Sequence, residues 1–330
     1  IFSVFLIFYG YFFGKYLLLT FKKSKTNLLA DNQFQKIQSF HENSTYRLGG
    51  VIIFSLLVLV FLYLYFFRNI FSFEYVSFCT LFFLLGLVDD LKIHIAPKFR
   101  LLIMIAFLAA LVISNEIYIK KTGLEFLDNL IAIDIFSLMF MCLCFIFIIN
   151  GSNLIDGFNG LLGIHSLIIF IVLFAINLIN ENNNLVYILF YISLLTLIFL
   201  KFNFPKAQIF LGDSGAYLIG TLIAVSVIKT SILNPSIHPF FFCILLFYLF
   251  FEVFFSFCRK LFVVRQSPLL PDSQHLHMLL YKVLFKKNKT KLNSNYTVSI
   301  YINSIYLLLI IPGIIFMNNA LFSRYYFLFL

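Results

Sequence analysis

The chain has 330 residues, of which 62% are hydrophobic and 12% are charged, and its mean hydropathy is +1.00. This composition excludes an ordinary soluble domain and indicates a membrane protein. The formal net charge of +10 does not by itself indicate a nucleic-acid partner, because its meaning depends on where the charges lie.

The apolar runs predict about ten transmembrane helices of roughly 20 residues each. The candidate spans are 1–20, 48–67, 75–91, 98–115, 131–149, 164–180, 185–201, 214–230, 237–257 and 297–317, and residues 325–330 begin an eleventh. We therefore expect an all-α, polytopic membrane protein in which residues 1–330 form one transmembrane domain. The chain begins and stops partway through apolar runs, as truncation at either end would produce.

Lysine and arginine are divided unevenly between the two sets of connections. The connections near 21–47, 88–100, 150–163, 201–214 and 258–296 carry 18 of these residues, and the opposite set carries five. By the positive-inside rule, the first set faces the cytoplasm. The same connections combine aspartate, asparagine, glycine and histidine, whereas the outer loops look like generic connectors. The sequence therefore predicts an active site on the cytoplasmic face.

A polar segment, NGSNLIDGFNGLLG at Asn150–Gly163, separates the fifth and sixth predicted spans. Asparagine and glycine are costly next to hydrocarbon, because unpaired polar groups are expensive there and glycine weakens helices. The segment therefore favours a ligand site over a plain connection. Its polar side chains include Asn153, Asp156 and Asn159, whose spacing of three would place them on one face of a helix.

Adjacent carboxylates occur in GLVDDL, where Asp89 and Asp90 end the third predicted span. Two such charges repel each other and require a counter-charge, a proton or a metal. Hard cations such as Mg²⁺ prefer carboxylate oxygens. The alternative is a solvated helix end, although carboxylates oppose the helix dipole there. Candidate counter-charges are Lys92, Lys98 and Arg100.

Two further motifs stand where helices are predicted to begin. In YRLGG, Tyr46–Gly50, Arg47 beside a glycine pair is suited to a phosphate, although a snorkelling arginine is an equal alternative. In FLGDSGAYLIG, Phe210–Gly220, Asp213 offers a carboxylate to a cation, next to backbone N–H groups suited to an anion. The alternative for the second motif is a simple N-cap by Asp213 or Ser214.

The longest inner connection contains RQSPLLPDSQHLHMLLY, Arg265–Tyr281. Its His275 and His277 are separated by one residue, which suits a strand or turn better than one helix face. Zinc is disfavoured because no cysteine or third histidine is nearby. Binding a diphosphate with the help of Arg265 is the better interpretation. The lysines that follow, at 282–291, indicate contact with lipid headgroups rather than nucleic acid.

One acidic residue, Glu252, lies deeper in a span than the others. Intramembrane acids are functional candidates by default, and a structural pair with Arg259 or with a polar group on another helix is an equal alternative. A secondary transporter would place acids and broken helices near the middle of its spans. The aspartates instead cluster at one surface, so we prefer an enzyme to a transporter.

The ordered motifs GLVDDL, NLIDGFNG, FLGDSG and PDSQHLH resemble those of the polyprenyl-phosphate N-acetylhexosamine-1-phosphate transferases, glycosyltransferase family 4. The resemblance extends from about residue 41 to Tyr281. The His-x-His loop looks like that of the WecA-like branch, whereas the MraY-like branch typically has three consecutive histidines. The resemblance implies transfer from a UDP-N-acetylhexosamine, such as UDP-GlcNAc, to undecaprenyl phosphate, with release of UMP.

The resemblance also implies roles for individual residues. Asp89 and Asp90 match the aspartates thought to orient or deprotonate the lipid phosphate. Asp213 matches a metal-binding aspartate, with Asn153 as a second metal or phosphate contact, and the metal is Mg²⁺ with Mn²⁺ as an alternative. The remaining matches are to substrate-binding positions: Arg47, Asp156, Asn159, Arg265, His275 and His277. Two departures are Asn159, where many bacterial members have aspartate, and Tyr46, where proline is common.

The expected setting is the bacterial cytoplasmic membrane, where the product would initiate a cell-surface polysaccharide such as lipopolysaccharide. Expected partners are the UDP-sugar, undecaprenyl phosphate and membrane lipids, but no nucleic acid, and the resemblance is compatible with a homodimer. The alternative donor is the muramoyl-pentapeptide nucleotide of peptidoglycan synthesis. Less favoured alternatives are an ion-coupled transporter, a membrane metallohydrolase of lipid diphosphates and an inactive scaffold.

Overall fold

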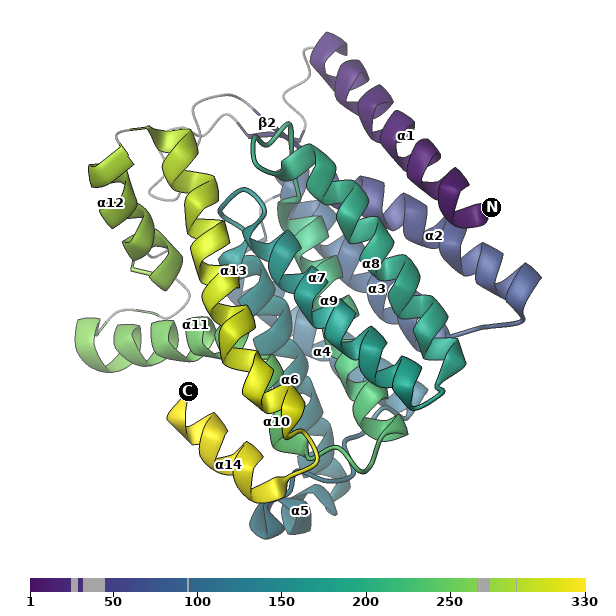
Figure 1. Ribbon diagram of the computed structural model, residues 1–330, viewed down its shortest axis with the longest axis vertical. Helices are drawn as coiled ribbons and strands as arrows, with labels where there is room; N and C mark the ends of the chain where they lie inside the picture. Colours follow the sequence, from purple (N-terminus) through teal and green to yellow (C-terminus); the bar gives the residue numbers. More distant parts are fainter. Residues whose placement is uncertain (25–28, 32–44, 94, 266, 268–273, 289) are drawn as a thin grey trace.

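The computed structural model describes residues 1–24, 29–31, 45–93, 95–265, 267, 274–288 and 290–330 (Figure 1). Helices dominate, and the strands are three short pieces. In chain order the elements are α1 (Phe2–Ser24), β1 (Ala30–Asp31), β2 (Thr45–Arg47), α2 (Gly49–Arg68), α3 (Phe73–Asp90), α4 (Pro97–Asn115), α5 (Glu125–Ile131), α6 (Asp134–Ile155), α7 (Leu161–Ile179), α8 (Asn183–Asn203), β3 (Ile209–Phe210), α9 (Gly212–Leu233), α10 (Pro239–Leu245), α11 (Phe247–Cys258), the π-helix η1 (Arg259–Val264), α12 (Leu276–Asn288), α13 (Lys291–Ile315) and α14 (Ala320–Phe329).

The prediction of a polytopic, all-α membrane protein is confirmed. Within the described ranges, eight helices are long and apolar enough to cross a membrane, or nine if the bent pair of α10 and α11–η1 counts as one span. The predicted span at 75–91 corresponds to α3, whose 18 residues include three acids and fall short of that criterion. Residues 325–330, which are predicted to begin an eleventh span, lie within and directly after α14.

The predicted continuous span 237–257 is wrong. The chain bends by 72° between α10 and α11, and α11 with η1 extends sideways from the helix bundle (Figure 1). Such a break frees backbone carbonyls that need other donors inside a membrane protein. The Tyr306 hydroxyl on α13 supplies one of them by donating to the Leu245 carbonyl at 2.5 Å.

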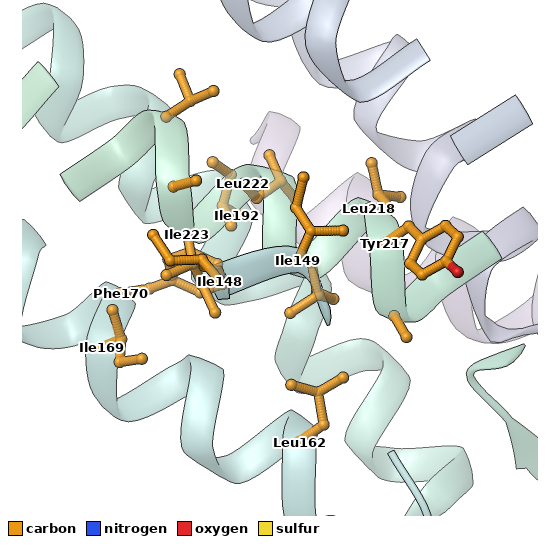
Figure 2. Packing of buried hydrophobic residues seen from close by; sticks show 14 of the residues in the cluster. Ile148, Ile149, Leu162, Ile169, Phe170, Ile192, Tyr217, Leu218, Leu222 and Ile223 are labelled. Atoms are coloured by element: carbon orange, nitrogen blue, oxygen red, sulfur yellow. The ribbon is translucent and has the colours of Figure 1, made fainter. Parts of the chain in front are cut away.

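Helix α9 lies at the centre of the bundle, since 78% of an apolar 18-residue stretch of this helix is buried. Apolar side chains of α6, α7 and α8 pack around it (Figure 2). Lipid tails are as apolar as these side chains, so close packing rather than transfer from water must hold such helices together. Gly220 on α9 permits the close approach of α6, because a Cβ there would lie 2.8 Å from the Ile149 Cα. Large apolar side chains such as Phe8 and Phe12 on α1 are exposed instead, as lipid contact requires.

A small sheet, which the sequence did not predict, ties two loops together. Strand β2 pairs antiparallel with β1 and parallel with β3. Strands β2 and β3 are followed directly by α2 and α9, respectively. Pairing of Arg47 with Phe210 therefore places the start of α2 beside the start of α9, and the Gly50 N–H donates to the Leu211 carbonyl at 2.9 Å.

Candidate active site

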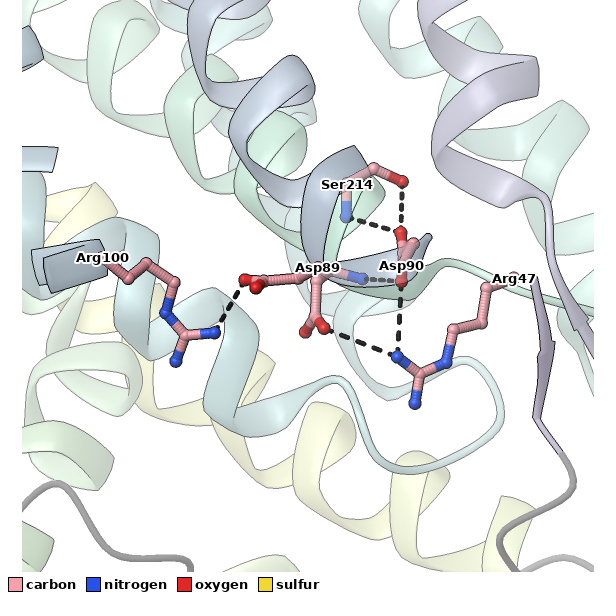
Figure 3. A network of polar contacts seen from close by, with 6 residues as sticks. Arg47, Asp89, Asp90, Arg100 and Ser214 are labelled. Atoms are coloured by element: carbon pink, nitrogen blue, oxygen red, sulfur yellow. Dashed lines mark hydrogen bonds and ion pairs between the residues drawn. The ribbon is translucent and has the colours of Figure 1, made fainter. Parts of the chain in front are cut away.

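Three of the predicted motifs converge at the N-terminus of α9. The β2–α2 junction brings Arg47, the end of α3 brings Asp89 and Asp90, and the start of α9 brings Asp213 (Figure 3). The four residues come from positions as far apart as 47 and 213 in the chain. The structure thus brings these three motifs together, and their role as one functional site stays a prediction.

Glycines allow the three segments to approach so closely. A Cβ added at Gly86 of α3 would lie 2.5 Å from the Ser214 Cα and 2.5 Å from the Asp213 carbonyl oxygen, and one at Gly50 of α2 would lie 2.8 Å from the Gly215 Cα. All three distances are below those that real Cβ atoms adopt, and the atoms met are backbone, which cannot rotate away. The N-terminus of α9 is therefore clamped between α2 and α3 by glycine contacts.

We expect Gly86→Ala to destabilise the protein by about 1–3 kcal/mol, the usual cost of overpacking a well-packed contact, and to reduce any activity of the site. Thermal unfolding in detergent measures the effect. Gly157→Ala is the matched control, because a Cβ there meets nothing within 4 Å. Equal melting temperatures for the two variants would contradict the clamp.

Asp90 caps α9 from a neighbouring helix. Its carboxylate accepts hydrogen bonds from the Asp213 N–H at 3.0 Å and from the Ser214 N–H and hydroxyl at 2.9 and 2.6 Å (Figure 3). The expected alternative, capping by the side chain of Asp213 or Ser214 itself, is wrong. Gly212 has a φ of +78°, and a Cβ there would lie 2.6 Å from Asp90 Oδ2, so this turn requires glycine.

The predicted pair Asp89 and Asp90 does not act as a pair in the structure. Asp90 is 1% exposed and its oxygens are occupied by the α9 N-terminus. Asp89 points elsewhere and accepts a hydrogen bond from Arg100 Nη1 at 2.7 Å (Figure 3). Of the expected counter-charges, Arg100 is thus the partner of Asp89. The arrangement gives Asp90 a positioning role, and the expected contact of these aspartates with a lipid phosphate stays a prediction.

Arg47 links the accessible part of the site to the buried part. Its Nη1 donates to Asp90 Oδ1 at 3.3 Å and to Asp213 Oδ2 at 3.4 Å. The Arg47 and Asp213 side chains are 29% and 28% exposed, whereas that of Asp90 is fully buried. Asp213 is therefore the more accessible carboxylate of the pair, with a cation beside it that can also reach an incoming anion.

The polar segment 150–163 begins as the last turn of α6, which ends at Ile155. Asp156 follows with a φ of −79° and a ψ of 58°, outside the helix. The expectation that Asn153, Asp156 and Asn159 share one helix face is therefore wrong. Burial raises the pKa of Asp156 to about 8, and the nearby Asp213 carboxylate adds to the increase while the Arg47 guanidinium opposes it. Asp156 thus belongs to the same electrostatic group as Asp213.

Asn159 anchors the turn of this segment. It is 2% exposed, its N–H donates to Asn295 Oδ1 at 2.7 Å, and its side-chain amide donates to the Pro205 carbonyl at 2.8 Å. The next N–H, of Gly160, donates to Asn203 Oδ1 at 2.6 Å. An aspartate at 159 would place a carboxylate against the Pro205 carbonyl, so these contacts explain the asparagine. Its expected contact with a nucleotide stays a prediction.

His275 and His277 lie together beside the polar segment. Their rings stack at 5.4 Å with an interplanar angle of 5°, and the His277 ring packs edge-on to Phe158 at 5.4 Å. Both face the carboxylate of Glu252; the alternative pair of Glu252 with a polar group of another element is confirmed. Arg265 is exposed at the end of η1 with a φ of 55°. Residues 268–273 lie outside the described residues, so its expected role stays a prediction.

Sequence reasoning missed two residues of the site. Ser214 was considered only as a cap, although its hydroxyl donates to Asp90. Tyr217, one turn further along α9, is 0% exposed and lies near enough to Arg100 and Asp213 to interact with their charges. The spacing of four between Asp213 and Tyr217 was the available signal, because it places both on one helix face.

Two carboxylates of the site offer oxygen atoms, the ligand type that Mg²⁺ prefers. Among the residues that the structure describes, no three or more His, Cys, Asp or Glu side chains are grouped to hold a metal ion. Mg²⁺ does not require such a cage, since it is usually bound by one or two carboxylates together with water and substrate phosphates. Asp213 and Asp156 offer oxygen ligands, and their mutual repulsion would be relieved by a divalent cation. The pairing of Asp213 with Asn153 stays a prediction.

Sequence comparison places this site in a known family. Residues 72–231, which include α3 and most of α9, match the model of glycosyl transferase family 4. The undecaprenyl-phosphate alpha-N-acetylglucosaminyl 1-phosphate transferase of Thermotoga maritima is 28% identical over 208 residues, which cover 62% of this chain and 60% of that protein. A probable undecaprenyl-phosphate N-acetylglucosaminyl 1-phosphate transferase of Bacillus subtilis is 26% identical over 197 residues, covering 58% of this chain and 53% of that protein.

The other branch of the family is also similar. The phospho-N-acetylmuramoyl-pentapeptide-transferase of Dictyoglomus turgidum is 31% identical over 240 residues, which cover 70% of this chain and 74% of that protein. The part of the chain that matches the family model thus contains Asp89, Asp90, Asp156 and Asp213. The chain belongs to glycosyl transferase family 4.

Proposed function

We propose that the protein transfers N-acetylhexosamine-1-phosphate from a UDP-N-acetylhexosamine, with UDP-GlcNAc as the first candidate, to undecaprenyl phosphate. The observation that carries this proposal is the group formed by Arg47, Asp89, Asp156 and Asp213 at the ends of apolar helices. Such a place suits a reaction between a lipid phosphate and a soluble nucleotide, because the acyl chain stays in the membrane. The family and the names of the relatives support the same reaction.

The reaction is a phosphoryl transfer. An oxygen of the lipid phosphate attacks the β-phosphorus of the UDP-sugar, and a new P–O bond forms. The bond between the β-phosphorus and the bridging oxygen breaks, and that oxygen leaves with UMP. The product is undecaprenyl-diphospho-sugar. Two anions must meet, so positioning and charge neutralisation carry most of the catalysis.

The residues of the site can divide this work. Arg47, now shared between Asp90 and Asp213, can donate to a phosphate oxygen and reduce its charge. Arg100, paired with Asp89, can do the same for the second anion. Asp213 and Asp156 would hold Mg²⁺, which when bound neutralises diphosphate charge and polarises the phosphorus. Asp90 keeps the α9 N-terminus in place for these contacts.

The identity of the sugar-nucleotide donor is the more specific part of the proposal. Phospho-N-acetylmuramoyl-pentapeptide transferases are 31% and 32% identical over comparable lengths, which makes the muramoyl-pentapeptide nucleotide the second candidate. The His-x-His sequence at 275–277 favours the smaller UDP-N-acetylhexosamine. The positive-inside pattern would place the site toward the cytoplasm of a bacterial cell, where both nucleotides are made.

A donor comparison tests this proposal. Purified protein in detergent with undecaprenyl phosphate and Mg²⁺ would receive UDP-GlcNAc, UDP-GalNAc or UDP-MurNAc-pentapeptide, and lipid products and UMP would be quantified. We expect lipid-linked N-acetylhexosamine from the first or second donor. Product from the pentapeptide nucleotide alone would establish the second candidate instead.

The raised pKa of Asp156 predicts a pH-dependent stability in the absence of metal. The folded protein binds this proton more tightly than the unfolded chain, whose value is near 3.8. Stability therefore falls as the pH rises from about 4 to about 8 and then levels off. Melting temperatures in chelator across this range should decline more steeply for the native protein than for Asp156→Asn. Mg²⁺ should stabilise the native protein most at the upper end. Parallel slopes for the two proteins would contradict the assignment.

A further inference from the structure

Glu252 is surrounded by hydrogen-bond donors. Its Oε2 lies 2.9 Å from His275 Nδ1. Its Oε1 lies 3.2 Å from His277 Nδ1, 3.2 Å from the Leu276 N–H and 3.1 Å from the Tyr248 hydroxyl. Glu252 is 1% exposed, and the side chains of the two histidines are 2% and 0% exposed. A carboxylate buried this deeply is tolerated only if its oxygens accept hydrogen bonds or pair with a charge.

These contacts determine where the imidazole protons lie. An ionised carboxylate only accepts hydrogen bonds, so both Nδ1 atoms must carry the proton that faces it. The Tyr248 hydroxyl is nearer to Glu252, at 3.1 Å, than to His277 Nδ1, at 3.5 Å, and so donates to the carboxylate. Burial also lowers the pKa of the His277 imidazole, although the hydrogen bond from His277 to Glu252 opposes that shift. A neutral imidazole protonated on Nδ1 leaves Nε2 as an acceptor.

The Nε2 atom of His277 is the unexplained group of this cluster. It is buried and has no hydrogen-bond partner among the residues that the structure describes. An unsatisfied buried polar atom costs about 1–3 kcal/mol. The ring packs edge-on to Phe158, two residues after Asp156 in the polar segment of the site. A donor that arrives with the substrate would remove this cost.

We propose that Glu252 is a positioning residue that holds His275 and His277 as Nδ1–H tautomers, so that their Nε2 atoms accept hydrogen bonds from uncharged N–H or O–H groups of the nucleotide sugar. An unprotonated Nε2 repels phosphate oxygens, so hydroxyl, acetamido or uracil N–H groups are the matching ligands. The family resemblance implies that this loop binds the diphosphate or the sugar, and the tautomers favour the sugar over the diphosphate. The part that concerns the ligand rests on the proposed transferase function; the tautomers do not.

Replacement of Glu252 by glutamine separates the two histidines. Glutamine has one acceptor oxygen and one donor NH₂ group. The oxygen should remain where it accepts from Tyr248, Leu276 and His277, because the reverse orientation would lose three bonds and keep one. The NH₂ group then faces His275 Nδ1, which can accept only if its proton moves to Nε2. Glu252→Gln should therefore change the tautomer of His275 and leave that of His277 unchanged.

Solid-state ¹⁵N NMR of histidine-labelled protein in lipid tests the tautomers directly. Removal of each histidine in turn assigns the signals. We expect Nδ1–H tautomers for both residues in the native protein, and Nε2–H for His275 alone in Glu252→Gln. Tyr248→Phe is the matched control, because it removes one donor to Oε1 and no acceptor, and should leave both tautomers unchanged. Nε2–H or doubly protonated rings in the native protein would overturn the proposal even if Glu252→Gln failed to fold.

Kinetics test whether Glu252 acts through His275. Loss of a group that orients a metal-binding histidine typically costs about 10–100-fold. By analogy, Glu252→Gln should lower kcat/KM for the UDP-sugar by that factor without changing the KM for undecaprenyl phosphate. In a His275→Ala background the same substitution should cost less than about twofold, because the two changes remove one function. Multiplicative losses would overturn the positioning role. Absence of activity with every donor would instead refute the proposed function, and the NMR result would still decide the tautomers.

Discussion

Asp213→Asn is expected to lower turnover by about 10²–10³-fold, the range found when one preorganised electrostatic contact of an active site is removed. The amide has nearly the same shape but no negative charge. It cannot attract a divalent cation strongly, and it can hold the Arg47 guanidinium, which now lies 3.4 Å from Asp213 Oδ2, only through a hydrogen bond to a neutral oxygen. Initial rates at saturating Mg²⁺ measure the loss.

The fold should tolerate this change. The start of α9 is held through the Asp213 N–H by Asp90, and the Asp213 side chain is 28% exposed. The melting temperature of Asp213→Asn should therefore stay within about 2 °C of the native value, as for most surface substitutions. A folded variant that kept more than a tenth of native turnover would contradict a central catalytic role for Asp213.

Asp90→Ala is expected to unfold or strongly destabilise the protein. The substitution leaves the N–H groups of Asp213 and Ser214 and the Ser214 hydroxyl without their acceptor at a buried helix start. It also removes a partner of Arg47. Breaking a buried charged pair typically costs about 3–5 kcal/mol, which for a protein of this size lowers the melting temperature by about 5 °C or more.

The adjacent residue supplies the control. Asp89→Ala removes a carboxylate whose side chain is 11% exposed and whose partner, Arg100, is 29% exposed. The Arg100 guanidinium can then turn to water, so the stability loss should be about 1 kcal/mol or less, whereas activity should fall. If Asp89→Ala were the less stable variant, the capping role of Asp90 would be wrong.

The bundle could be predicted from the sequence because apolar runs must be helical in a bilayer, where every backbone group needs an internal partner. The break near Leu246 could not be predicted. The residues next to the break are apolar on both sides, and the donor to the Leu245 carbonyl is Tyr306, 61 residues later in the chain. Composition records how apolar a segment is, whereas a bend depends on which distant side chain reaches the freed carbonyl.

The candidate site also has features that could be predicted from the sequence and features that could not. The motifs around Arg47, Asp89 and Asp213 could be chosen because polar residues at a membrane boundary are costly without a function. The difference between Asp89 and Asp90 could not be predicted, since adjacent residues on a helix point in directions about 100° apart and only the packed neighbours decide what each meets. For Asn159 the decisive contact is the Pro205 carbonyl, which no local pattern indicates.

The most direct test of the account follows the phosphorus atoms. Purified protein would be given undecaprenyl phosphate, Mg²⁺ and UDP-GlcNAc labelled with ³²P in the β-phosphate, with UDP-GalNAc labelled in the same way as the second donor. Transfer of a sugar phosphate predicts that the label enters the lipid while unlabelled UMP is released in equal amount. Label that stayed with the nucleotide as UDP would show transfer of the sugar alone. That result would contradict the proposed reaction at the site built around Asp213.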